Sequence, residues 1–263
     1  WLKLIAYSTN KTMQSFHTRD INKIEVFDSQ SDLIIYDVDK NEVTNIENDS
    51  TEFECYPTWS PDGKWLYYVS AHFEFRDTIP HETECVNRSK EIKYSIYRKS
   101  FNPETMHFGP REMVFDAASL GKSATLPRIS PDGKYLLFSM GEWGCFHIWH
   151  RDADLYMLRL ADNKVWPLTK TNSPQAESFH NFSSNGKWII FSSRRNDGDY
   201  TRLFFAHVDA DGNTTKAFEL PQQDPDFHRM FMKSYNIPEF MRGPVTIKPQ
   251  EFADVLRNDN IEP

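Results

Sequence analysis

Short runs that alternate apolar and polar residues recur along the chain, and tight-turn sequences join them in pairs. In WSPDGKWLYYVSA (59–71), Asp62-Gly63 separates two such runs, and the same corner returns in ISPDGKYLLFSMG (129–141). A third copy, FSSNGKWIIFSSRR (182–195), has Asn-Gly at the corner. Asp-Gly and Asn-Gly adopt the backbone angles that a hairpin turn requires, so each copy predicts two antiparallel strands.

The hairpins belong to a larger repeat. The turn glycines Gly63, Gly133 and Gly186 lie 70 and 53 residues apart. A second alternating stretch follows each hairpin, at 93–101, 153–169 and 201–221, and an earlier copy occupies 4–10 and 31–46. Each unit therefore has four strands, a pattern typical of propeller blades. A four-stranded sheet cannot bury both faces alone, whereas radially stacked sheets can. The repeat predicts an all-β protein, a β-propeller of four-stranded antiparallel blades.

The predicted organisation has two parts. Blades occupy 1–221, as a partial blade at 1–49 and further blades at 51–116, 124–170 and 177–221. The remainder, 222–263, is rich in proline and aromatic residues and lacks the blade periodicity. We expect this segment to pack on the propeller with its rings buried, namely Phe227, Phe231, Tyr235 and Phe240. One helix is expected, in PQEFADVLRN near the C-terminus.

Charge and hydropathy narrow the function classes. The chain has 30 Lys and Arg against 38 Asp and Glu, a net charge of −8, which argues against nucleic acid as a partner. The longest apolar runs have the length of strands, so no transmembrane segment is predicted, while peripheral membrane association stays open. The three cysteines, Cys55, Cys85 and Cys145, show no metal-binding spacing. Cys55 and Cys85 fall on one predicted face, where a disulfide or free thiols are alternatives.

The corner motifs carry a family resemblance. PTWSPDGKWLYYVSA (57–71) and PRISPDGKYLLFSM (127–140) resemble the SPDG repeats of TolB-like, or WD40-like PD40, β-propellers, over roughly 1–221. GCFHIWHRDADLYML (144–158) and SYNIPEFMRGPV (234–245) are similar to segments of TolB-like proteins of Bacteroidetes. The resemblance implies a six-bladed parent ring, a periplasmic or exported location, and a protein or peptide partner.

Strand order predicts where a ligand would bind. If the SPDG corners lie on one face, the loops between second and third strands and the entries to first strands share the other. The candidate ligand-binding residues on this loop face are His17, Arg19, His147, Trp149, His150, Arg151, His180, Arg194, Arg195 and Asp197. Guanidinium groups bind carboxylates in a bidentate manner. The alternatives are a core histidine at 180, internal ion pairs at 194–199, and a Trp149 that packs between blades.

Motifs for catalysis are weak. No GxSxG elbow is present, and HETEC (81–85) has Cys85 where a zincin needs its second histidine. A non-enzymatic binding propeller is therefore favoured, with no cofactor, metal or catalytic residue assigned. The alternative is a metal-dependent, carbohydrate-active enzyme resembling oligogalacturonate lyase, with His17, His147, His150 and His180 near the metal. Against it, His147 and His150 are three residues apart, which on a strand places them on opposite faces.

Overall fold

The computed structural model describes residues 3–16, 24–47, 49–76 and 78–257. Its strands are β1 (Leu4–Phe16), β2 (Ile24–Asp37), β3 (Glu42–Asn45), β4 (Glu52–Trp59), β5 (Trp65–His72), β6 (Ser95–Asn102), β7 (His107–Phe115), β8 (Ser123–Ile129), β9 (Tyr135–Gly141), β10 (Asp154–Arg159), β11 (Lys164–Pro167), β12 (Glu177–Phe182), β13 (Trp188–Ser193), β14 (Arg202–His207) and β15 (Phe218–Glu219). The helices are α1 (His81–Asn87), α2 (Phe227–Met230) and α3 (Pro249–Arg257), with 3₁₀ turns at Ser89–Glu91, Ala118–Leu120 and His147–Trp149.

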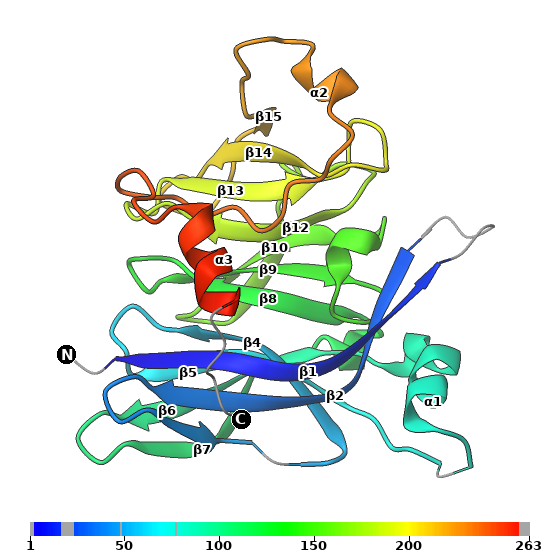
Figure 1. The fold of residues 1–263 in the computed structure, drawn as a ribbon, viewed down its shortest axis with the longest axis vertical. Helices are drawn as coiled ribbons and strands as arrows, with labels where there is room; N and C mark the ends of the chain where they lie inside the picture. The colour runs from blue at the N-terminus through cyan, green and yellow to red at the C-terminus, as the bar shows by residue number, and fades with distance from the viewer. Residues whose placement is uncertain (1–2, 17–23, 48, 77, 258–263) are drawn as a thin grey trace.

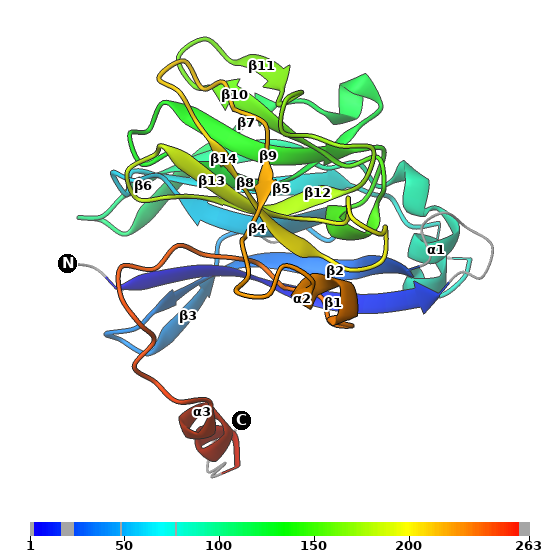
Figure 2. The same cartoon turned by 90° about the horizontal axis from the view of Figure 1, so that it is seen from above.

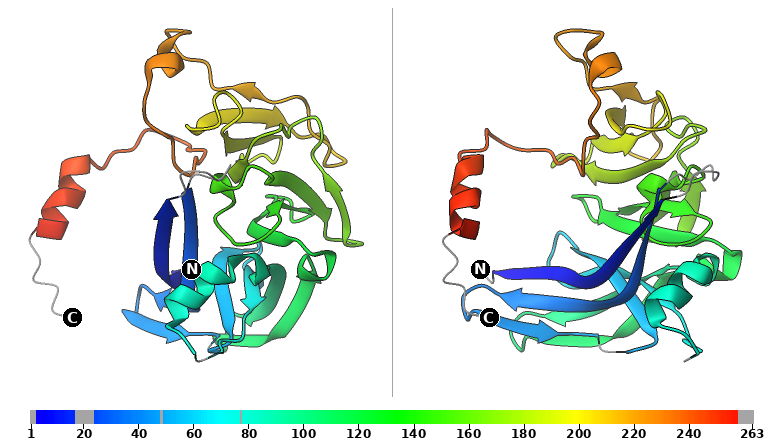
Figure 3. Two further views of the ribbon diagram at one scale, coloured as in Figure 1. Left: turned by 90° about the vertical axis from the view of Figure 1, so that its right-hand side faces the viewer. Right: turned by 45° about the vertical axis from the view of Figure 1, so that its right-hand side comes forward.

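These strands form four antiparallel sheets, which are arranged as the blades of a β-propeller. One sheet has three strands, β1-β2-β3, and the others have four, in the orders β4-β5-β6-β7, β8-β9-β10-β11 and β12-β13-β14-β15. Figure 1 shows the sheets stacked along the long axis of the molecule, and Figure 3 shows them grouped around a common centre. The all-β propeller architecture predicted from the repeat is confirmed.

A repeated set of hydrogen bonds explains the SPDG corner. The Ser60 hydroxyl donates to Asp62 Oδ1 at 2.5 Å and accepts from the Trp65 amide at 3.0 Å. The same bonds recur around Ser130 and Asp132, and around Ser183 and Asn185 in the third copy. The corner glycines take φ of +69°, +71° and +68°. Because this left-handed region favours glycine, the predicted turn conformation is confirmed.

Each complete sheet also has a bulge in its first strand, which the alternation pattern did not predict. Pairing between first and second strands shifts register between Cys55 and Thr58, between Thr125 and Arg128, and between Ser178 and Asn181. The residues at the bulges, Tyr56, Leu126 and Phe179, have φ of 53°, 54° and 52°. A β-bulge turns the following side chains toward a new direction. Here the bulge determines which side chains of the first strand face the neighbouring sheets.

The core lies between neighbouring sheets. The second and third sheets share one cluster, which includes Phe53, Val69, Tyr94 and Phe138, all nearly inaccessible to solvent. A second cluster joins the third and fourth sheets through Leu137, Leu155 and Phe191, and a third joins the first and second through Leu33 and Tyr68. Radial stacking of the sheets therefore buries the apolar faces, as the repeat predicts.

Two local predictions need correction. The helix in 249–257 is confirmed as α3, but α1 was not expected, and it carries the HETEC sequence. The tail rings are less buried than predicted, since Phe227 is 37% and Phe240 is 38% exposed, and Phe231 and Tyr235 are half-buried. Figure 2 shows α3 standing away from the sheets. Among the described residues, no helix is long and apolar enough to cross a membrane.

Candidate functional site

The predicted loop face corresponds to one end of the sheets. Figure 1 shows α1 and the far ends of β1 and β2 at the same end of the sheets, opposite the chain's N-terminal end. The 3₁₀ turn at 147–149, the two residues after it and the β13–β14 connection carry seven of the ten candidate ligand-binding residues. His17 and Arg19 lie outside the described residues. The other eight candidates divide into four buried or largely buried side chains and four more accessible ones.

His180 is a buried histidine whose Nε2 donates to the Leu126 carbonyl oxygen at 2.7 Å. The acceptor is the carbonyl of the bulge residue in β8, and His180 directly follows the bulge residue of β12. Burial, and next the charge of Arg128, lower the pKa of His180 to about 3. The imidazole is therefore neutral at physiological pH, and its position corresponds to the core alternative rather than to a ligand contact.

His147 and His150 are also buried. Their position in and after a 3₁₀ turn corrects the expectation that they occupy opposite faces of a strand, and their ring centroids lie 5.7 Å apart. His147 Nδ1 is 3.2 Å from Thr125 Oγ1 and 3.1 Å from Ser139 Oγ. Burial lowers the pKa of His147 to about 3 and that of His150 to about 4. Both rings are packed inside the third sheet's loop.

Arg195 belongs to a buried ion pair and is not an exposed loop arginine. Its Nη2 contacts Glu177 Oε1 at 3.0 Å and donates to the Thr171 carbonyl at 2.8 Å. The Glu177 side chain is 0% and that of Arg195 17% exposed. The guanidinium also lies over the Phe204 ring, 4.4 Å from its centroid. These contacts fix Arg195 within the fourth sheet, so the expectation of an accessible side chain is corrected.

The accessible candidates meet across two sheets. The Arg194 guanidinium stacks on Trp149, with its central carbon 4.6 Å from the ring centroid. Arg194 Nη2 donates to the Asp199 carbonyl at 2.5 Å, while its Nε has no hydrogen-bond partner within the described structure. Exposed Arg151 donates to the Pro174 carbonyl at 3.1 Å. The half-buried Trp149–Arg194 pair therefore joins the third-sheet loop to the β13–β14 connection.

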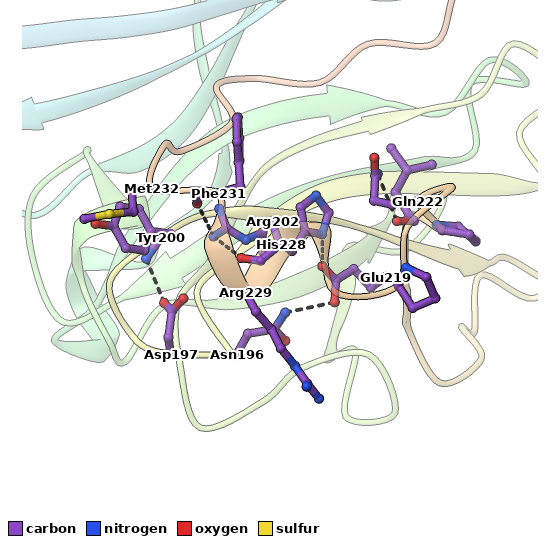
Figure 4. A pocket seen from close by; sticks show the side chains of 13 residues that line it. Asn196, Asp197, Tyr200, Arg202, Glu219, Gln222, His228, Arg229, Phe231 and Met232 are labelled. Atoms are coloured by element: carbon purple, nitrogen blue, oxygen red, sulfur yellow. Dashed lines mark hydrogen bonds and ion pairs between the residues drawn. The ribbon is translucent and has the colours of Figure 1, made fainter.

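A pocket of about 730 Å³ opens beside that connection, and we call it the tail pocket. Figure 4 shows its side chains, which come from the β13–β14 connection, β14, β15 and the segment around α2. Its lining residues are Asn196, Asp197, Tyr200, Arg202, Glu219, Leu220, Pro221, Gln222, Pro225, His228, Arg229, Phe231 and Met232. Asp197 is the sequence-predicted candidate that lines it.

Arg202 forms the floor of the tail pocket. Its buried guanidinium donates to the carbonyl oxygens of Lys233 at 2.7 Å, Phe231 at 2.8 Å and His228 at 3.0 Å. These bonds attach α2 and the chain after it to β14. The peptide carbonyls thus stabilise the buried cation, and the same bonds hold one wall of the pocket in place.

The pocket lining contains both polar and apolar groups. Glu219 accepts hydrogen bonds from Asn196 Nδ2 at 2.8 Å and from His228 Nδ1. His228 Nε2 lies 3.2 Å from the Tyr235 hydroxyl. Tyr200, Phe231 and Met232 supply apolar surface, and Met232 is largely exposed. A concave site with apolar walls and a few fixed polar groups suits a side chain with adjoining backbone.

Asp197 accepts from the amides of Asp199 and Tyr200, so its carboxylate caps its own loop. Among the described residues, the one group of three possible metal ligands close enough to share an ion is Asp28, Cys55 and Cys145, which contains no histidine. The metal centre of histidines expected for the enzymatic alternative is not formed by His147, His150 and His180.

Sequence reasoning missed most of the tail pocket. Arg202 and Glu219 occur within ordinary strand patterns, and their partners are backbone atoms or residues of the tail. The available signal was the aromatic and methionine content of 227–235, which indicated packing but not a cavity.

No protein-family model matches this chain, and no curated protein sequence does. Several solved structures are similar to it at low identity. TolB from Acinetobacter baumannii is 17% identical with a TM-score of 0.46, covering 80% of this chain and 43% of that one. A putative TolB from Agrobacterium tumefaciens is 12% identical with a TM-score of 0.44, covering 85% and 71%. Oligogalacturonate lyase from Vibrio parahaemolyticus is 17% identical with a TM-score of 0.41, covering 68% and 42%. The chain thus spans less than half the length of the first and third of these proteins.

Proposed function

We propose that this chain is a non-enzymatic binding propeller that recognises a protein or peptide segment on its loop face, at the tail pocket and the adjoining Trp149–Arg194 pair. The observation that carries the proposal is the open pocket of about 730 Å³ with its mixed walls. Tyrosine, tryptophan, methionine and arginine are enriched where proteins bind one another, and all four occur here.

The arrangement favours an extended peptide with one apolar anchor. Tyr200, Phe231 and Met232 would contact the anchor, while Asn196 and Glu219 offer polar groups to the peptide backbone. Arg194, whose guanidinium stacks on Trp149, would attract an acidic side chain beside the anchor. A periplasmic or exported location stays a prediction, tested by fractionation of the producing cells.

A phage-displayed random peptide library provides the test without knowledge of the natural partner. Peptides selected on the wild-type protein should bind Tyr200→Ala and Met232→Ala more than about tenfold more weakly, because truncating a central interface residue costs about 2 kcal/mol or more. The affinity is measured by fluorescence anisotropy of labelled peptides. Arg194→Ala should weaken acidic peptides most.

Matched surface variants serve as controls. Met113→Ala removes an exposed methionine on β7, and Arg159→Ala removes an exposed arginine that pairs with Asp162 at the far end of β10. Both should bind the selected peptides as the wild type does. Peptides that bind the pocket variants and the wild type equally, or a selection that enriches nothing, would contradict the proposal.

A further inference from the structure

Three side chains with metal-binding chemistry meet inside the propeller, away from the tail pocket. Asp28 comes from β2, Cys55 from β4, and Cys145 from the β9–β10 connection, so each belongs to a different sheet. Their ligand atoms all lie within 4.8 Å of one another, and all three residues are buried. The three cysteines of the chain are free, and Cys55 neighbours Cys145 here rather than forming the alternative disulfide with Cys85.

The separations match those of a tetrahedral metal site. Cys55 Sγ and Cys145 Sγ each lie 3.7 Å from the same oxygen, Asp28 Oδ2. Zinc–sulfur bonds of about 2.3 Å and zinc–oxygen bonds of about 2.0–2.2 Å at tetrahedral angles place sulfur and oxygen ligands about 3.5–3.7 Å apart. A small cavity of about 10 Å³ adjoins the group and is lined by Asp28 and Cys145. One more atom can therefore approach the site.

Neutral groups, and not cations, contact the Asp28 carboxylate among the described residues. Within the described structure, no lysine or arginine forms an ion pair or hydrogen bond with the Asp28 carboxylate. Its oxygens accept instead from Thr12 Oγ1 at 2.7 Å and from Asn10 Nδ2 at 2.7 Å. Asn10 Nδ2 is also 3.3 Å from Cys55 Sγ. Neutral donors of this kind orient metal ligands in an outer shell, whereas they do not balance a buried negative charge.

We propose that Asp28, Cys55 and Cys145 bind one zinc ion, which fastens three sheets of the propeller together. Zinc accepts thiolate and carboxylate ligands in the same site, whereas magnesium and calcium avoid sulfur and copper(I) prefers sulfur alone. Binding replaces the two thiol protons, which leave to solvent, so two protons are released per ion. The adjoining cavity provides for a fourth ligand from solvent.

The position explains what the ion would do. Cys55 directly precedes the bulge residue Tyr56 in the first strand of its sheet, and Cys145 lies in the loop that leads to the buried histidines. A zinc ion bound by both cysteines and by Asp28 would connect the β1–β2 hairpin to two neighbouring sheets. This role is independent of peptide binding at the tail pocket, and the two proposals fail separately.

The test uses purified full chain and the metal alone. Titration with cobalt(II), a zinc substitute with visible absorption, should produce thiolate-to-metal charge-transfer bands and saturate at one ion per chain. Zinc should displace the cobalt, release two protons, and raise the thermal unfolding midpoint. Cys145→Ser and Asp28→Asn should bind zinc at least about 100-fold more weakly, since even outer-shell changes cost 10–100-fold. Cys85→Ser is the matched control, because it removes a buried cysteine outside the group and should bind zinc like the wild type.

A second measurement does not depend on the folding of any variant. Anomalous diffraction at the zinc edge, from wild-type crystals grown with zinc, should place the ion between the two sulfur atoms and Asp28. Cobalt spectra without thiolate bands, equal zinc affinity in Cys145→Ser, or a Cys55–Cys145 disulfide in protein purified with zinc would each overturn the proposal.

Discussion

Replacing Arg195 by alanine should destabilise the protein strongly, although a loop arginine normally tolerates this change. The substitution removes the partner of Glu177, whose side chain is wholly buried. Burial raises the pKa of Glu177 and lowers that of Arg195, so desolvation of the two charges outweighs their mutual attraction in both cases. The pair therefore stabilises mainly because neither charge is left alone.

The magnitude follows from what Glu177 keeps. After the change its carboxylate still accepts from the Ser173 amide at 3.0 Å, the Ser173 hydroxyl at 2.5 Å and the Ser193 hydroxyl at 2.7 Å. Removing one partner of a buried ion pair costs about 3–5 kcal/mol. Because three donors still stabilise the Glu177 carboxylate, we expect a loss at the lower end of this range, about 3 kcal/mol. Arg195→Lys should lose less stability than Arg195→Ala, because the ammonium keeps a positive charge beside Glu177, although it replaces only part of the guanidinium fork.

Urea unfolding followed by tryptophan fluorescence measures the effect. The double variant Arg195→Ala/Glu177→Gln should recover at least about 1 kcal/mol of the loss, because no buried charge remains. Arg159→Ala, at an exposed arginine paired with Asp162, should leave the unfolding midpoint unchanged. A loss within about 0.5 kcal/mol for Arg195→Ala would refute the reasoning and restore the exposed-loop interpretation.

Three further changes test the buried groups and the corners. The pKa of His180 is lowered to about 3 in the folded protein, so as the pH falls the unfolded chain takes up the histidine proton before the folded chain does. Between about pH 7.5 and about pH 5, the free energy of unfolding of the wild type should therefore drop by about 2 kcal/mol more than that of His180→Gln. Equal losses in urea unfolding would contradict this. Burial and the charges of Glu47 and Glu52 raise the pKa of Glu54 to about 8, so folding becomes less favourable as the pH rises toward that value. Glu54→Gln should therefore stabilise the protein by about 2–4 kcal/mol at about pH 8 and hardly at about pH 4. Chemical unfolding at both pH values measures the difference. Gly133→Ala, at φ +71° with open space around the added carbon, should cost about 1 kcal/mol, and Gly133→Asn less; an unchanged midpoint for alanine would mean that the turn relaxes.

The blade architecture was predictable because its signals are local. The whole corner is made by three residues at fixed spacing, all visible in the sequence. They are a serine, whose hydroxyl donates a hydrogen bond, an aspartate or asparagine, whose side-chain oxygen accepts it, and a glycine. The bulges were not visible, because Tyr56, Leu126 and Phe179 are residue types that seldom take positive φ. Only the surrounding sheet holds them in that conformation.

The candidate site was harder to predict for a related reason. Charge at 194–197 indicated a polar loop, but whether Arg195 faces solvent or Glu177 depends on contacts 18 residues away in the neighbouring strand. The partners of Arg202 are carbonyl oxygens, which every residue possesses and no sequence pattern records. Three-residue spacing of His147 and His150 misled because a 3₁₀ turn replaced the expected strand.

The repeated bulge has a consequence for protein engineering. A non-glycine residue held at positive φ costs about 1–3 kcal/mol, and three sheets each contain one at the bulge of the first strand. A designed ring made from identical copies of the third sheet would inherit that cost once per copy, so its strain would grow in proportion to its circumference. Asparagine in place of Leu126 in every copy would relieve the backbone, because asparagine tolerates positive φ better than leucine does.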